Sequence, residues 1–310
     1  MKKSVFCEST SIALQQISSI FDFSWPAYTA LWNLRWQVRG YLNAMEEEKQ
    51  IVSNEKLKSI FVTKSLHGVN LINLSKSEWI DLEDVFSQIL LTYAFSIYEG
   101  WIEEIGTILN WKRKNKEALQ HYISYGKKTS DIKTFLKEWH TELSPKDKLV
   151  RDVLYGELKK NKKYAYDSLI DLMKCYRCFK EARNAFVHTN GKITENLKTS
   201  YDIYIARQSA IQKIIKEAPI FLPLGAIGDK FSLSLRGVVG FYNIIINLIV
   251  TLDAELANSK YAEKLFIYRI QGKTIKERAT KHAMIVGFFR ENGILFDKSK
   301  VDSIIDLVIK

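Results

Sequence analysis

Residues 77–108 read SEWIDLEDVFSQILLTYAFSIYEGWIEEIGTI, and the apolar side chains among them recur at steps of three and four residues. The recurring positions run from Leu82 to Ile108. That spacing places them on one side of a helix with about 3.6 residues per turn. The chain of 310 residues contains only four prolines, so few positions interrupt a helix. The segment therefore predicts one long amphipathic helix, and the chain as a whole predicts an all-α fold.

Helical patterns continue on both sides of this segment. Ser144 is expected to cap a helix whose first position is Pro145. Residues 59–74 mix β-branched residues with glycine, asparagine and serine, and they fit a short strand or an irregular connection equally well. Residues 218–228, with two prolines and two glycines, predict a loop. The other expected helices cover residues 25–44, 131–140, 164–188, 199–216, 231–270 and 301–309.

The pattern favours a helical bundle with an addition at each end. Residues 77–257 form the predicted bundle. Residues 1–76 are interpreted as a mostly helical N-terminal extension, and residues 258–310 as a basic, helical C-terminal extension. The sequence contains no internal repeat and no low-complexity tract.

The charge balance is basic, with 46 Lys and Arg against 35 Asp and Glu, a net charge of +11. Such an excess attracts polyanions and raises the rate at which they are encountered. It favours nucleic acid as a partner but does not identify the anion. Two basic clusters, residues 112–116 and 159–163, could hold an RNA backbone, although such a cluster is more often a solvated surface.

The location is predicted from cysteine usage and from apolar segments. Three cysteines are too few, and odd in number, for a disulfide framework, which favours a reducing compartment. The basic start of the chain meets Glu8 and polar residues, so it does not resemble a signal peptide. Residues 237–252 are the most apolar segment, but they are too short for a span and contain Asn243 and Asn247. A buried core helix and a cytoplasmic protein without a membrane segment are expected.

The segment with the most chemical information is residues 181–191, EARNAFVHTNG. Arg183 falls into the apolar series of the preceding helix, where a guanidinium needs an anionic partner or a wet cavity. His188 falls in the last helical turn before Asn190 and Gly191, which form a plausible helix stop. The negative end of the helix dipole favours a protonated histidine, which suits a group that takes and gives a proton near neutral pH.

The spacing between Arg183 and His188 leaves two interpretations open. A step of five residues turns the helix by about 140°, so the two side chains would not share a face. Either the helix loosens before His188, or the site forms where this helix end meets a second molecule. A purely structural alternative is that Arg183 pairs with a buried carboxylate such as Glu99.

The hexapeptide Arg183–His188 resembles the Arg-x4-6-His motif of the HEPN superfamily, and Asn184 matches the polar residue that often follows the arginine. The succeeding Thr-Asn-Gly and the all-helical setting also fit. The similarity covers roughly residues 77–257, while the specific match is confined to Arg183 through Gly191.

This resemblance implies a HEPN-like bundle and a metal-independent endoribonuclease with Arg183, Asn184 and His188 as its catalytic residues. It also implies a homodimer with a composite active site, RNA as the substrate, and a role as a toxin or anti-phage defence effector with a possible antitoxin or defence-system partner. A rival interpretation is a catalytically silent HEPN-like module that binds RNA, a nucleotide or a protein. A third is a basic helical scaffold in which Arg183 forms a structural ion pair.

Other candidate sites in the sequence are weaker. Cys175 and Cys178 have the spacing of half a zinc site, but no second cysteine pair or suitably spaced histidine pair accompanies them. No metal or cofactor is therefore expected. The remaining histidines are isolated and are assigned no role, namely His67, His121, His140 and His282. The acidic residues Glu99, Glu103 and Glu104 on the long helix are expected to face solvent or to be paired.

Overall fold

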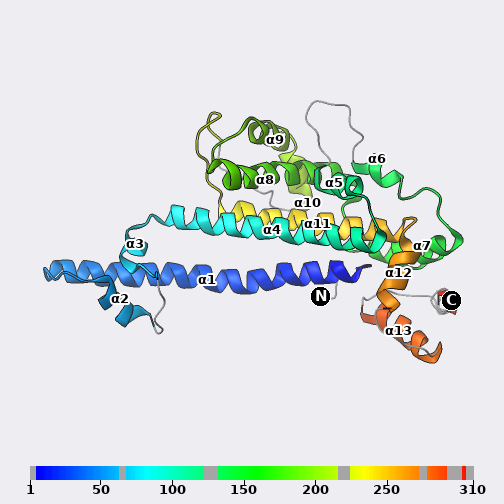
Figure 1. Ribbon diagram of the computed structural model, residues 1–310, viewed down its shortest axis with the longest axis horizontal. Coiled ribbons are helices and arrows are strands. Elements are labelled where there is room, and N and C mark those ends of the chain that lie inside the picture. Colours follow the sequence, from blue (N-terminus) through cyan, green and yellow to red (C-terminus); the bar gives the residue numbers. More distant parts are fainter. Residues whose placement is uncertain are drawn as a thin grey trace. The chain divides into compact units, whose positions relative to one another are not determined.

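The computed structural model describes residues 5–62, 68–121, 132–215, 224–271, 278–291 and 302–304, and every regular element within these ranges is a helix (Figure 1). The predicted all-α fold is therefore confirmed. Of the loop expected at 218–228 and the helix expected at 301–309, only residues 224–228 and 302–304 lie within the described ranges. The longer helices are α1 (Glu8–Glu47), α4 (Trp79–Leu109), α7 (Pro145–Leu158), α8 (Leu169–Thr189), α9 (Glu195–Ile205), α11 (Leu235–Ala257), α12 (Ala262–Gln271) and α13 (Arg278–Glu291). The shorter ones are α2 (Asn54–Phe61), α3 (Leu71–Lys76), α5 (Arg113–His121), α6 (Ile132–Lys137), α10 (Gln208–Ile215) and the 3-10 turn η1 (Tyr166–Ser168).

The chain forms two compact units. The larger unit comprises Met1–Gln15 together with Ser87–Lys310, and the smaller unit comprises Gln16–Phe86. Helices α1 and α4 each contribute to both units. The predicted boundaries at 76/77 and 257/258 stay predictions.

The smaller unit has its own apolar core, formed by Val38 of α1, Leu57 of α2 and Leu71 of α3. The strand considered for residues 59–74 is wrong for the described part of that segment, where α2 ends at Phe61 and α3 begins at Leu71, and the described residues between them, 62 and 68–70, form an irregular connection. The reason is local, because the Asn70 side chain accepts a hydrogen bond from the backbone N–H of Asn73 and so starts α3.

The core of the larger unit is aromatic and joins α4, α8 and α11, which run side by side (Figure 1). Phe241 of α11 stacks on Phe179 of α8, with ring centroids 4.5 Å apart. Phe95 of α4 lies 5.1 Å from Phe241 and 5.3 Å from Tyr176. The long helix expected over residues 77–108 is confirmed as α4, and its Phe95 side faces this core.

Helix α11 is the most apolar helix of the described part of the chain. Among the described residues, α11 is the one helix that is long and apolar enough to cross a membrane, judged by length and composition. In its most apolar stretch of 18 residues, 72% is buried inside the larger unit. Its polar residue Asn247 is buried and donates to the backbone oxygen of Asn243 at 2.7 Å. The expected buried core helix is thus observed.

Hydrogen bonds explain where α7 begins and where two expected helices are divided. Ser144 caps α7 ahead of Pro145, as the sequence predicted, and Asp147 forms a reciprocal capping box with it. The single helix expected over 199–216 is wrong, because α9 ends at Ile205 and α10 begins at Gln208. Between them, Arg207 makes two hydrogen bonds to Asp171 of α8, at 2.7 and 3.1 Å.

The helix expected over 231–270 is also divided. It is interrupted at Asn258 to Tyr261, where the Ser259 hydroxyl donates to the Leu256 carbonyl and accepts from the Tyr261 N–H. A serine that hydrogen-bonds to nearby backbone groups in this way competes with the helical pattern.

Candidate active site at the end of helix α8

Helix α8 ends where the sequence predicted. It remains helical through Thr189, and Asn190 then takes a left-handed conformation with φ 54° and ψ 40°. The backbone N–H groups of Asn190 and Gly191 both donate to the carbonyl of Ala185. A left-handed residue followed by glycine is a common helix end, because it satisfies carbonyls that the helix leaves open.

The end of α8 is fixed by the segment that precedes α11. Lys192 and Lys230 form an isolated antiparallel bridge, and the N–H of Phe231 donates to the Gly191 carbonyl at 3.1 Å. The rings of Phe186 and Phe231 pack with centroids 4.6 Å apart. This contact covers the Phe186 side of the helix end, whereas Val187 and His188 remain exposed.

We expect Gly191→Ala to lower the free energy of unfolding by about 1–2 kcal/mol, which is the usual cost of a left-handed conformation for a residue with a Cβ. Gly191 has φ +73°, and an added Cβ would lie 3.3 Å from the Phe186 ring. Chemical denaturation followed by circular dichroism measures the change. The matched control is Gly100→Ala in α4, where nothing lies within 4 Å of the added Cβ. That control should leave stability equal or higher, and an equal loss in both variants would contradict the prediction.

Arg183 has no acidic partner among the described residues. Its side chain is partly buried, and its Nε atom is fully buried without a hydrogen-bond partner. Its one described hydrogen bond runs from Nη1 to Oδ1 of Asn184, at 3.2 Å. The pairing with Glu99 that the sequence allowed is not made, because Glu99 accepts from Lys180 at 2.9 Å. Glu181 is likewise paired, with Arg177.

Two further cations lie near Arg183 on α8, and each is paired with a carboxylate. Lys180 lies one turn before Arg183 on α8, and Arg177 lies one turn earlier still. Burial lowers the pKa of Lys180; Glu99 opposes this effect, while the charges of Arg177 and Arg183 lower the pKa further. Arg183 is the one of these three cations without a carboxylate among the described residues, and a partly desolvated guanidinium favours an anion as its partner.

His188 is exposed near the end of α8, four residues after Asn184. Residues four apart share a helix face, so Asn184 and His188 are neighbours on the surface. Arg183 and His188 are five apart on a helix that stays regular through Thr189, so their side chains leave about 140° apart. The interpretation in which the helix loosens before His188 is wrong. Within one chain, Asn184 therefore accepts a hydrogen bond from Arg183 and shares a helix face with His188, whereas Arg183 and His188 lie on different faces.

A second group of ionisable residues lies elsewhere in the larger unit, and no sequence pattern indicated it. Both Tyr155 and Tyr164 donate to Oε1 of the buried Glu255, at 2.9 and 2.7 Å. The Nε2 atom of His140 lies 2.9 Å from the other oxygen of Glu255. Burial and the neighbouring Glu255 raise the pKa of Tyr155. Because Glu255 already contacts three groups, this cluster ties α7 and the segments around it to α11.

The basic clusters and the cysteines differ in what they present to solvent. Within residues 112–116, Arg113 pairs with Glu117 and Lys116 pairs with Glu103, so much of that positive charge is neutralised. Within residues 159–163, Lys159 lies over the Tyr155 ring. The expectation that Glu99, Glu103 and Glu104 would be paired or facing solvent is confirmed, since the first two form ion pairs and Glu104 is exposed. The thiols of Cys175 and Cys178 are buried, and burial raises the pKa of both, which disfavours a reactive thiolate.

Comparison with known proteins does not assign this chain to a class. No protein-family model matches it, and neither a curated protein nor a solved structure does. A functional interpretation therefore depends on the geometry around Arg183 and on the motif that Arg183 and His188 resemble.

Proposed function

We propose that this protein is a metal-independent endoribonuclease whose catalytic residues are Arg183, Asn184 and His188. The observation that carries the proposal is the state of Arg183, which has a buried Nε without a partner and no ion pair among the described residues. The two nearby carboxylates, Glu99 and Glu181, are bound to other cations. An arginine in this state is suited to an external anion, and a phosphate matches the geometry of its guanidinium.

RNA is the substrate that this chemistry favours, because its 2′-hydroxyl is an internal nucleophile next to each phosphate. In the proposed reaction the 2′-oxygen loses its proton and attacks the phosphorus, and the bond to the 5′-oxygen breaks. His188 takes the first proton or gives one to the leaving 5′-oxygen. Arg183 stabilises the charge on the phosphorane, and Asn184 orients the phosphate or the imidazole. The products are a 2′,3′-cyclic phosphate and a 5′-hydroxyl.

A homodimer is part of this proposal. A two-fold axis near the end of α8 would bring Arg183 of one copy toward His188 of the other, and so would complete a site that one chain does not align. The exposed pair Val187 and His188 at this helix end is consistent with a contact surface there. A toxin or anti-phage role, and an antitoxin or defence-system partner, follow from the HEPN resemblance alone.

The distribution of charge supports RNA binding by the larger unit. Residues 16–86, the smaller unit, contain seven Lys and Arg and nine Asp and Glu. The net positive charge of the chain therefore resides entirely in the larger unit, which also contains Arg183. A polyanion would be attracted to that unit in preference to the smaller one.

A second candidate function is a catalytically silent module that binds RNA, a nucleotide or a protein through the same residues. The observation that favours it is the angle between Arg183 and His188, since a single chain presents an anion site without an aligned histidine. Such a module would bind RNA with Arg183 and would leave it intact.

Cleavage of RNA in excess EDTA tests the proposal against this alternative. We expect the purified full-length protein to cut total RNA at an unchanged rate in the chelator, because the proposed chemistry uses only side chains. We expect 3′-end analysis to find cyclic phosphates. Binding of the same RNA without cleavage would favour the silent module, and loss of cleavage in EDTA would contradict metal independence.

A further inference from the structure

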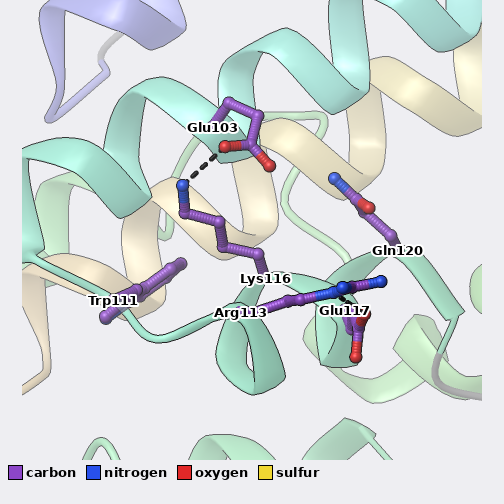
Figure 2. Close-up of a pocket in the computed structure, with 6 residues that line it drawn as sticks. All are labelled: Glu103, Trp111, Arg113, Lys116, Glu117 and Gln120. Atoms are coloured by element: carbon purple, nitrogen blue, oxygen red, sulfur yellow. Dashed lines mark hydrogen bonds and ion pairs between the residues drawn. The ribbon is translucent and has the colours of Figure 1, made fainter.

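A polar pocket of about 430 Å³ lies between α4 and α5, in the larger unit (Figure 2). Glu103 belongs to α4, Trp111 lies between the two helices, and the other lining residues belong to α5. Its volume is within the range of small-molecule sites. The complete lining is Glu103, Trp111, Arg113, Lys116, Glu117 and Gln120.

The pocket contains charged groups but offers no excess charge. Lys116 contacts Glu103 at 2.5 Å, and Arg113 contacts Glu117 at 2.6 Å, so each cation is matched by one carboxylate (Figure 2). A phosphate would have to displace a carboxylate from its cation in order to bind. A neutral ligand with several hydrogen-bonding groups is the better match.

Several lining groups keep hydrogen-bonding capacity that a ligand could use. Each carboxylate uses one oxygen in the described contacts and keeps the other as an acceptor. The Gln120 amide has both a donor and an acceptor, and the Arg113 side chain is 91% exposed, with a planar guanidinium on which a base can stack. Trp111 is buried against Trp139 at 5.4 Å and provides a rigid wall.

Guanine fits these groups better than the other bases. Its Watson–Crick edge carries adjacent N–H donors, which a carboxylate accepts, and the O6 acceptor, to which an amide or guanidinium donates. Adenine places an acceptor where guanine has a donor, so it would leave a carboxylate facing a lone pair. Cytosine and uracil are smaller and lack the pair of adjacent donors.

The pocket is connected to the candidate active site through α8. Lys180 donates to the backbone oxygen of Gln120 at 3.4 Å, and it also holds Glu99 of α4. Arg183 and Asn184 follow Lys180 by three and four residues and therefore lie one turn along the same side of α8. The backbone of Gln120 is thus held to the side of α8 that carries Arg183.

We infer that this pocket binds an unpaired guanine base, with Glu117 and Gln120 reading its edge and Arg113 stacking on its face. If the guanine belongs to an RNA, the inference rests on the proposed ribonuclease function, and the pocket gives that ribonuclease a sequence preference. The same chemistry would also hold the base of a free guanine nucleotide.

Binding measurements with the full-length His188→Ala protein separate these sources, because that variant removes cleavage from the experiment. Two fluorescein-labelled uridine octamers are compared by anisotropy, one with a single central guanosine and one with adenosine. We expect the guanosine RNA to bind about tenfold more tightly, as for one or two hydrogen bonds to a charged acceptor. Unlabelled GMP and AMP are then added as competitors.

Two pocket variants identify the groups involved. Glu117→Gln and Gln120→Ala, each in the His188→Ala background, are expected to reduce the guanosine preference to about twofold or less. The matched control is Asp202→Asn, since Asp202 forms a comparable exposed i,i+4 pair with Lys198 on α9. The control should keep the full preference.

Each outcome decides between the two proposals. Competition by GMP but not AMP, without a difference between the octamers, would assign the pocket to free guanine nucleotides. Equal binding of both octamers together with equal competition would overturn the inference. If wild type cuts RNA while neither the octamers nor the competing mononucleotides show a guanine preference, only the pocket inference fails. If the preference is present but wild type does not cut, only the ribonuclease proposal fails.

Discussion

His188→Ala is expected to lower the rate of RNA cleavage by a factor of about 100 to 10,000, the usual contribution of a general acid or base. The variant should remain folded, because His188 is exposed and substitutions of exposed side chains change stability by less than about 0.5 kcal/mol. Initial rates on a fluorogenic RNA, with circular dichroism as the folding check, measure both effects. The matched control is His282→Ala, an exposed histidine on α13, which should cut like wild type.

Arg183→Ala separates a catalytic role from a structural one. The proposal expects loss of cleavage with little loss of stability, since no ion pair of Arg183 would be broken in the described structure. Arg183→Lys keeps the charge but loses the planar fork, so it should recover only part of the activity. If Arg183→Ala instead lowers stability by several kcal/mol while His188→Ala changes nothing, the basic-scaffold interpretation is favoured.

Mixing the two inactive variants tests the composite site. If each site takes Arg183 from one copy and His188 from the other, a heterodimer of Arg183→Ala and His188→Ala has one intact site. Random pairing would then restore about one quarter of the wild-type activity. If both residues of a site come from the same chain, the mixture stays inactive. The RNA would then have to contact Arg183 and His188 on two different faces of the same helix.

The sequence predicted those parts of the fold that depend on local patterns. The period of the apolar residues predicted α4, Ser144 followed by Pro145 predicted the start of α7, and Asn190-Gly191 predicted the end of α8. In each case the deciding atoms lie within a few residues of each other. Such local signals can be read without knowing which distant residues come into contact.

The parts that could not be predicted depend on contacts between distant residues. The sequence allowed Glu99 as a partner for Arg183, but the folded chain brings Lys180 to Glu99 and leaves Arg183 without a carboxylate. The separation of α9 from α10 occurs where Arg207 reaches Asp171, 36 residues earlier. Both outcomes depend on three-dimensional proximity, which hydrophobic periodicity does not encode.

Asp253→Ala is expected to have the largest effect on stability, a loss of about 3–5 kcal/mol. Asp253 is buried in α11 and accepts hydrogen bonds from the backbone N–H of Phe6 at 2.5 Å and of Cys7 at 2.9 Å. It also accepts from the hydroxyl of Thr10 at 2.7 Å. Burial raises the pKa of Asp253, and these three donors offset part of the rise. Removing the carboxylate would leave all three donors buried without an acceptor.

Chemical denaturation of Asp253→Ala and Asp253→Asn, compared with the exposed control Asp202→Asn, measures this loss. The asparagine variant keeps the shape but presents an NH₂ group where one oxygen accepted, so two donors would face each other and stability should still fall. Asp202→Asn should stay within about 0.5 kcal/mol of wild type. Hydrogen exchange gives an independent readout, since the amides of Phe6 and Cys7 should lose their protection in both Asp253 variants. A free energy of unfolding of Asp253→Ala within about 1 kcal/mol of wild type, with those amides still protected, would contradict the prediction. The segment before α1 would then be held chiefly by other contacts. These are the packing of Val5 in the core and the hydrogen bond from Arg269 to the Val5 carbonyl at 3.2 Å.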